Sequence, residues 1–179
     1  QLRLLYAYQY AHPGKKLIFQ GMEFGQWLEW NHGKSLDWHL TQFPMHDGLR
    51  RLVQHLNWLY TNEPSFHELD DSYDGFEWVD FHDADNTVWS FVRKSRTGAD
   101  ILFIINATPV VRPAYRVGIA VHGFYEEVLN TDAGTYGGSN VGNYGGRWSD
   151  ENWAWQGKPN SILLDLPPLA VIAFKYKKD

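Results

Sequence analysis

The hydrophobic pattern of this chain changes its period at one point, and that change constrains the fold more than any other feature. Residues 46–61 place leucine or valine at helical spacing on one face. The later apolar residues instead fall into short runs between turn residues, which is the pattern of antiparallel strands. Residues 62–75 separate the two patterns with Pro64 and a cluster of acids. We therefore predict an α-β-α region over 1–68 and an antiparallel β-sandwich over 69–179.

The first region contains two helices with one strand between them. Residues 1–11 are apolar on nearly every side of a helix, so we expect this helix to be buried and to end at the Pro-Gly pair after His12. No capping residue precedes it, which suggests that a segment upstream is missing. Residues 17–20 form a short apolar run typical of a strand in a parallel sheet. One such strand cannot close an eight-stranded barrel.

The second region contains seven expected strands. They are residues 76–81, 87–94, 100–108, 115–119, 124–130, 161–166 and 170–176. Short strands with turn signals between them are typical of a sandwich. The polar stretch 131–160, with its Gly-Gly pairs, is expected to be a long loop, and loops of this length are usually functional or mobile.

Composition excludes several classes of protein. The chain has 179 residues, fewer than the roughly 250 of a complete α/β barrel, but 44% of them are hydrophobic and can form a sizeable core. A net charge of −5 argues against a nucleic-acid partner. No apolar segment approaches the roughly 20 residues that span a bilayer, so we expect no membrane partner. The lack of cysteine excludes disulfides and fits a cytoplasmic location, which we expect.

Tryptophan is unusually frequent, with nine residues. Its large apolar faces match those of pyranose rings. We expect about two thirds of the nine to fill the core, since tryptophan is buried on average. Trp78, at the start of the sandwich, and Trp148, Trp153 and Trp155, in the long loop, are candidates for stacking on a glucan.

The loop after residues 17–20 carries three acids, Glu23, Glu29 and Asp37. Retaining glycosidases need two carboxyl groups about 5–5.5 Å apart, and barrel enzymes take them from the ends of several strands. Only one strand end is present, so we expect none of the three to be a nucleophile or a general acid. Glu23 is expected to hold the loop in place or to contact sugar, beside Trp27 and Trp30.

Other kinds of chemistry find little support. His32, His39 and Asp37 have the composition of metal ligands but lack a spacing such as His-x-x-x-His. No Gly-x-Gly-x-x-Gly lies between a strand and a helix. We expect neither a metal site nor a cofactor.

Several segments, taken in order, resemble one family. KKLIFQGMEFGQWLEWNHGKSLDWHL is similar to the eighth strand and following loop of the 1,4-α-glucan (glycogen) branching enzymes of the α-amylase superfamily, glycoside hydrolase family 13. LRRLVQHLNWLYTNEPSFHELD resembles the last barrel helix and its exit. GFEWVD, FIINATPVVRPAYRVGI, EEVLNTDAGTYGGSNVGN and LDLPPLAVIAF resemble the C-terminal β-domain of those enzymes. The resemblance covers essentially the whole chain.

This resemblance implies a retaining transglycosylase as the parent protein. Such an enzyme cleaves an α-1,4-glucan through a covalent glycosyl-enzyme and transfers the segment to a 6-hydroxyl, which forms an α-1,6 branch. The resemblance places all three catalytic acids, on strands four, five and seven, before residue 1. The chain itself is therefore expected to be inactive. Its implied partners are α-glucan and the rest of the barrel, and Glu23, Trp27, Trp30 and Trp78 are its candidate sugar contacts.

Two alternatives stay open at this point. The sandwich and the tryptophan content also fit a non-catalytic carbohydrate-binding module. The same motifs also fit a fragment of another enzyme of the superfamily, such as a debranching or trehalose-releasing enzyme.

Overall fold

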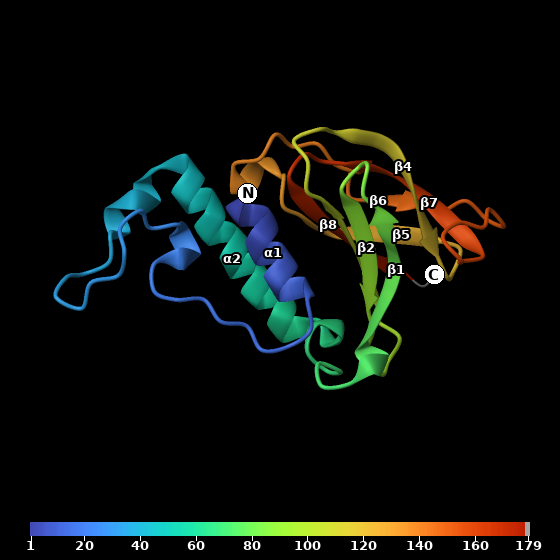
Figure 1. The fold of residues 1–179 in the computed structure, drawn as a ribbon, viewed down its shortest axis with the longest axis horizontal. Coiled ribbons are helices and arrows are strands. Elements are labelled where there is room, and N and C mark those ends of the chain that lie inside the picture. Colours follow the sequence, from blue (N-terminus) through green and yellow to red (C-terminus); the bar gives the residue numbers. More distant parts are fainter. Residues whose placement is uncertain (178–179) are drawn as a thin grey trace.

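The computed structural model describes residues 1–177 and arranges them in three layers (Figure 1). Two helices, α1 (Leu2–Ala11) and α2 (Pro44–Asn62), lie side by side and cover one face of a six-stranded sheet. A two-stranded sheet packs on the opposite face. No helix within residues 1–177 is long and apolar enough to cross a membrane.

The larger sheet is antiparallel throughout. Its strands, in spatial order, are β1 (Phe76–Asp83), β2 (Val88–Arg93), β3 (Ile101–Asn106), β8 (Ala170–Lys177), β5 (Phe124–Asn130) and β6 (Gly146–Trp148). The smaller sheet pairs β4 (Arg112–Ile119) with β7 (Asn160–Leu166). All seven predicted strands are confirmed, and the predicted mainly antiparallel fold is correct. The sequence reasoning missed β6, which lies inside the predicted loop 131–160.

Helix α2 confirms the helical pattern. Pro44 occupies the first turn, where its missing N–H costs nothing. Asp47, also in the first turn, accepts hydrogen bonds from Arg50 and Arg51, each at 2.7 Å. The apolar side chains at helical spacing are all buried: Leu49, Leu52, Val53, Leu56 and Leu59. The amphipathic face of α2 therefore fixes the helical layer on the sheet.

Helix α1 is buried on one face only. Tyr6 and Tyr10 lie in the core, whereas Leu2 and Leu5 are exposed. The expectation of a buried helix is therefore wrong for part of α1, because α2 and the sheet cover one side of it and leave Leu2 and Leu5 exposed.

The predicted strand at residues 17–20 is also wrong. The segment is extended but forms no strand, and the side chains of Leu17 and Phe19 are 79% and 53% exposed. A strand needs a neighbour to accept and donate its ladder hydrogen bonds, and none lies beside this segment within residues 1–177. The segment is held instead by Gln9, whose side chain donates to the Leu17 carbonyl at 2.7 Å.

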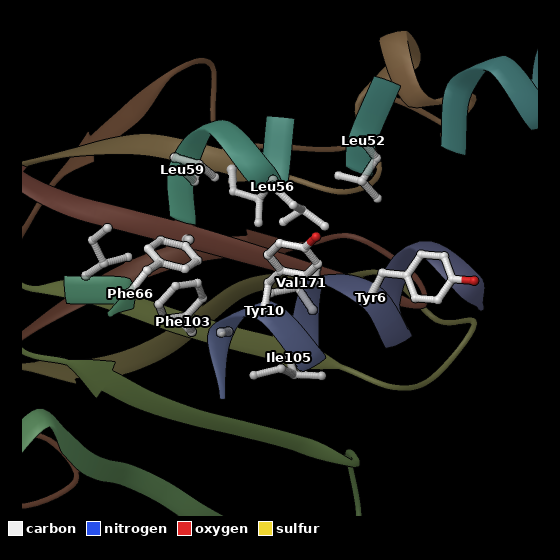
Figure 2. Packing of buried hydrophobic residues seen from close by; sticks show 14 of the residues in the cluster. Tyr6, Tyr10, Leu52, Leu56, Leu59, Phe66, Phe103, Ile105 and Val171 are labelled. Carbon is white, nitrogen blue, oxygen red and sulfur yellow. The ribbon is translucent and has the colours of Figure 1, made fainter. Parts of the chain in front are cut away.

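The six-stranded sheet has an apolar core on each face. Strand β3 is buried at every position. Phe103 and Ile105 face the helices, while Leu102 and Ile104 face the smaller sheet. Figure 2 shows the first of these cores, where side chains of α1, α2, β3 and β8 meet. The division of the chain at residue 68 stays a prediction.

Five short 3₁₀ helices connect these elements. They are η1 (Met22–Phe24), η2 (Trp38–Gln42), η3 (Pro64–Phe66), η4 (Tyr73–Gly75) and η5 (Gly134–Tyr136). The first two lie in the acidic, tryptophan-rich loop that precedes α2, so this loop is ordered by local turns rather than by a sheet.

Candidate functional site

The tryptophans are mostly on the surface. Eight of the nine are more than 40% exposed, and the expectation that about two thirds fill the core is wrong. The exposed ones are Trp27, Trp30, Trp38, Trp58, Trp78, Trp148, Trp153 and Trp155. Trp89 is the exception; its ring packs edge-on against Tyr8 of α1, with ring centroids 5.8 Å apart. Exposed aromatic side chains that gather in patches mark sites covered by a ligand or by another protein segment.

The largest group of exposed apolar side chains lies before and at the start of α2. We call it the loop surface, and it consists of Leu17, Phe19, Met22, Trp27, Leu28, Trp30, Trp38, Phe43 and Met45. In Figure 1 this segment extends away from the sheets, on the far side of α2. The loop surface is therefore an uncovered apolar face that belongs to the first region of the chain.

Glu23 lies in the middle of η1, on a turn between two glycines. Gly21 and Gly25 both have left-handed backbone conformations, with φ values of 85° and 69°. A side chain with a Cβ is strained in this conformation, so the glycines permit the tight turn. Within residues 1–177 no side chain or amide donates a hydrogen bond to the Glu23 carboxylate, which leaves it open to a ligand.

The turn around Glu23 is anchored by its neighbours. The Tyr6 hydroxyl donates to the Met22 carbonyl at 3.0 Å, and a ring nitrogen of His46 lies 2.7 Å from the Phe24 carbonyl oxygen. Burial raises the pKa of Tyr6, and the negative charge of Glu23 raises it further. Helices α1 and α2 together therefore fix the position of this carboxylate.

Trp27 and Trp30 border two adjoining cavities on the loop surface. The larger, of about 690 Å³, is lined by Trp27, and the smaller, of about 400 Å³, by Trp30. Met22 and Gln26 line both cavities. The Trp27 ring lies edge-on to His46, with centroids 5.2 Å apart. The structure thus brings Trp27 and Trp30 to one face, next to the turn that carries Glu23.

Trp78 lies apart from this face, on the edge strand β1. Its ring packs against Phe76, Phe81 and Phe91, at centroid distances of 4.9, 5.4 and 5.7 Å. It is 41% exposed and lines neither of the two cavities. The four predicted contacts therefore fall into two separate places.

The other two acids of the loop do not assemble with Glu23 around one cavity. Glu29 lines the smaller cavity, while Asp37 precedes η2 and its backbone amide donates to Gln26 at 2.9 Å. Among residues 1–177, no group of three or more His, Asp or Glu side chains could hold a metal ion.

Sequence reasoning missed a further cavity, of about 640 Å³, on the sandwich. It lies between the end of β1, strand β4 and residues 155–158. The sequence signal is the pair Gln156-Gly157 between Trp155 and Lys158, which is a short turn inside the stretch expected to be a loop.

Comparison with protein families gives one match. Residues 78–177 match the family described as "Alpha amylase, C-terminal all-beta domain". This range begins in β1 and includes the rest of both sheets.

Individual relatives match nearly the whole chain. The chain is 51% identical over 177 residues to the 1,4-alpha-glucan branching enzyme GlgB of Aquifex aeolicus, which covers 98% of this chain and 28% of that protein. It is 49% identical over 179 residues to the protein of the same name from Gloeobacter violaceus, covering 99% of this chain and 24% of that one. The chain thus spans about a quarter of the length of these relatives.

Solved structures share the fold at low sequence identity. The catalytic module of the glycogen-degrading pneumococcal virulence factor SpuA aligns over 99% of this chain and 31% of its own, with a TM-score of 0.66 and 12% identity. An α-amylase from H. orenii aligns over 98% of this chain and 35% of its own, with a TM-score of 0.60 and 14% identity. The helices and both sheets of this chain therefore follow an arrangement found in α-amylase structures, and by its matched sequence the chain belongs to the α-amylase C-terminal all-β domain family.

Proposed function

We propose that this chain is the C-terminal part of a 1,4-α-glucan branching enzyme. The observation that carries the proposal is the identity of about one half, over 96% or more of this chain, to branching enzymes from three organisms. The match includes residues 1–77, which the family model does not cover. Because the relatives named above are branching enzymes, this reading is favoured over a debranching or trehalose-releasing parent.

The whole enzyme would cleave an α-1,4-glucan and transfer the segment to a 6-hydroxyl, with retention at the anomeric carbon. Such a reaction needs one carboxylate nucleophile and one carboxylic acid that protonates the leaving oxygen. We propose that neither comes from this chain, in line with the separate positions of Glu29 and Asp37 relative to Glu23. The chain alone would then be inactive.

The first region would form the end of the catalytic barrel. The loop surface is apolar, and Leu17 and Phe19 lie exposed on an extended segment without a paired neighbour. The relatives are about four times longer than this chain, so they contain further sequence that could cover such a face. We propose that the rest of the barrel packs on the loop surface and covers the extended segment 17–20.

Glucan contact would occur in two places. Glu23, Trp27 and Trp30 would line the wall of the active site, where the Glu23 carboxylate can accept hydrogen bonds from sugar hydroxyls. Trp78 would provide a separate contact on the sandwich. A cytoplasmic location remains a prediction, which fractionation of the source cells would test.

Incubation of the chain with amylose tests its inactivity. Iodine absorbance and the number of α-1,6 linkages would be followed, with a full-length branching enzyme as the positive control. We expect no change in either quantity with the isolated chain. Formation of α-1,6 linkages by the chain alone would contradict the proposal.

A second candidate function is that of a carbohydrate-binding module, which the eight exposed tryptophans favour. Titration with maltoheptaose, followed by tryptophan fluorescence, separates this function from a purely structural role. A saturable change is expected for a binding module. An unchanged fluorescence spectrum at millimolar maltoheptaose would exclude the binding module and leave a structural role as the remaining candidate.

A further inference from the structure

The cavity on the sandwich has the composition of a sugar site. It joins one exposed tryptophan to several side chains that form hydrogen bonds. Among its lining residues are Asp80, Asp83, Arg112, Tyr115, Trp155 and Gln156. Its volume of about 640 Å³ lies within the range of small-molecule sites.

The tryptophan of this cavity is carried by a β-hairpin turn. Trp155 and Lys158 pair through two backbone hydrogen bonds, of 3.0 and 2.9 Å. Gln156 and Gly157 between them both have positive φ, 50° and 73°. Two such residues make the turn type that matches the twist of paired strands, so the hairpin is locally well defined.

Side chains clamp this hairpin to both sheets. The Gln156 amide accepts from the Gly118 N–H of β4 at 2.9 Å and donates to Asp80 of β1 at 2.8 Å. Lys158 forms an ion pair with Glu77 of β1. The backbone that carries Trp155 is therefore held in place before any ligand binds, which lowers the entropy cost of binding.

Close backbone packing adds to the clamp. A Cβ at Gly118 would lie 2.2 Å from the Trp155 carbonyl oxygen, so only glycine permits this approach. The ring itself stays 45% exposed at the edge of the cavity. A half-exposed indole on a fixed backbone is suited to stack on the apolar face of a sugar ring.

The polar groups beside the ring are also fixed. The Asp83 carboxylate accepts hydrogen bonds from the Tyr115 hydroxyl at 2.6 Å and from the Asn86 amide at 2.9 Å. The Nε atom of Arg112 is buried, and in the part of the chain that is described it has no hydrogen-bond partner. A ligand cannot reach this buried atom, so the donors that Arg112 can offer to the cavity it lines are the outer nitrogens of its guanidinium.

The charges indicate a neutral ligand. Two carboxylates, Asp80 and Asp83, line the cavity with two guanidinium groups, Arg112 and Arg116, and Arg116 is already paired with Asp150. The cavity therefore has no excess of positive charge that would attract a phosphate. Sugar hydroxyls donate and accept at once, and a mixed set of carboxylate, amide and guanidinium groups matches both roles.

We propose that this cavity, the Trp155 cleft, is a secondary glucan-binding site. Trp155 stacks on a glucose ring, and Arg112 donates to its hydroxyl oxygens. The identity of the sugar as an α-1,4-glucan rests on the proposed function. The cleft would hold a glucan chain away from both the loop surface and the ring of Trp78.

The test uses the chain labelled with 5-fluorotryptophan, so that each tryptophan gives its own ¹⁹F signal. The Trp155 signal is assigned by its loss in Trp155→Phe. During titration with maltoheptaose we expect it to shift saturably, while the signal of Trp58, an exposed tryptophan of α2 outside the cleft, stays unchanged. A Trp155 signal that does not move at millimolar maltoheptaose overturns the proposal.

Arg112→Gln provides a second variant that keeps the ring in place. We expect it to weaken the saturation of the Trp155 signal about tenfold, with no effect on the Trp78 signal. An unchanged titration in this variant overturns the role of Arg112. Equal shifts with cellohexaose overturn the assignment of an α-linked glucan.

The outcome separates this inference from the proposed function. Suppose the Trp155 signal does not shift, but the chain supports branching as part of a full enzyme. The glucan site at the Trp155 cleft is then wrong, and the proposed function stands. Suppose the Trp155 signal shifts saturably, but the chain does not support branching as part of a full enzyme. The proposed function is then wrong, and the glucan site stands.

Discussion

Arg93 of β2 forms an ion pair with Asp70, at 2.5 Å, and its guanidinium is fully buried. It also donates to the Ala11 carbonyl at 2.7 Å and to the Phe66 carbonyl at 3.2 Å. One side chain of the sheet thus joins the end of α1, the turn after α2 and the acidic segment that follows. The helical layer and the sandwich are connected through this residue as well as through the apolar core.

Replacement of this hub should destabilise the whole chain. In Arg93→Leu, Asp70 and three carbonyl groups, those of Ala11, Phe66 and Gly75, lose a buried partner. Removal of one member of a buried ion pair costs about 3–5 kcal/mol. Urea unfolding would measure the loss in the free energy of unfolding. The control is Arg96→Leu, which changes an exposed side chain and should cost less than about 0.5 kcal/mol. Equal stability of the two variants would contradict this role of Arg93.

The core of Figure 2 predicts that helices and sheets unfold together. Leu56 of α2 is fully buried there, between α1 and the sheet. We expect Leu56→Ala to lower the free energy of unfolding by about 2–5 kcal/mol. Circular dichroism in the far ultraviolet, which reports secondary structure, and in the near ultraviolet, which reports tertiary packing, should show the same unfolding midpoint. Leu28→Ala, on the exposed loop surface, serves as the control; separate transitions for helix and sheet would argue against a shared core.

The Trp78 ring should matter more for glucan than for folding. It is half-buried against Phe76 and Phe91. Trp78→Ala should therefore cost less than the roughly 3–5 kcal/mol of a fully buried large aromatic. Affinity electrophoresis in gels with glycogen should show weaker retention, and Trp78→Phe should keep part of it. A variant that unfolds would instead assign the ring to the core.

Acid should loosen the hairpin of the Trp155 cleft. Hydrogen bonds from Lys158, and then from Lys94, lower the pKa of Glu77 in the folded chain. The unfolded chain therefore binds more protons at acid pH, and the stability contributed by Glu77 is present above its ordinary carboxyl pKa and is lost as pH falls through the lowered value.

Chemical unfolding at a series of pH values checks this dependence. Stability should fall between about pH 5 and pH 3, and Glu77→Gln should flatten part of that fall. Glu151→Gln, which changes an exposed acid near the same hairpin, should leave the dependence as in the unmodified chain. If Glu77→Gln and Glu151→Gln changed the pH dependence of stability to the same extent, Glu77 would not be its specific source.

Periodicity was enough to predict α2 and most strands, because their side chains have one buried face. It failed for residues 17–20, where Leu17 and Phe19 have the composition of a buried strand but find no strand to pair with within residues 1–177. The prediction that most tryptophans fill the core failed for a related reason. The average burial of tryptophan does not apply to a face that binds a ligand or another protein segment. The Trp155 cleft was missed because Asp80 and Gln156 are far apart in sequence. They meet only where the two sheets pack together.

An exchange of segments shows whether this chain can complete a branching enzyme. This chain would replace the matching 177-residue segment of the A. aeolicus branching enzyme, to which it is 51% identical. The hybrid would be assayed on amylose for iodine absorbance and α-1,6 linkages. We predict that a folded hybrid forms α-1,6 branches although the isolated chain forms none. The proposed function would be wrong if the hybrid folded but formed no α-1,6 branches, or if the isolated chain formed such branches.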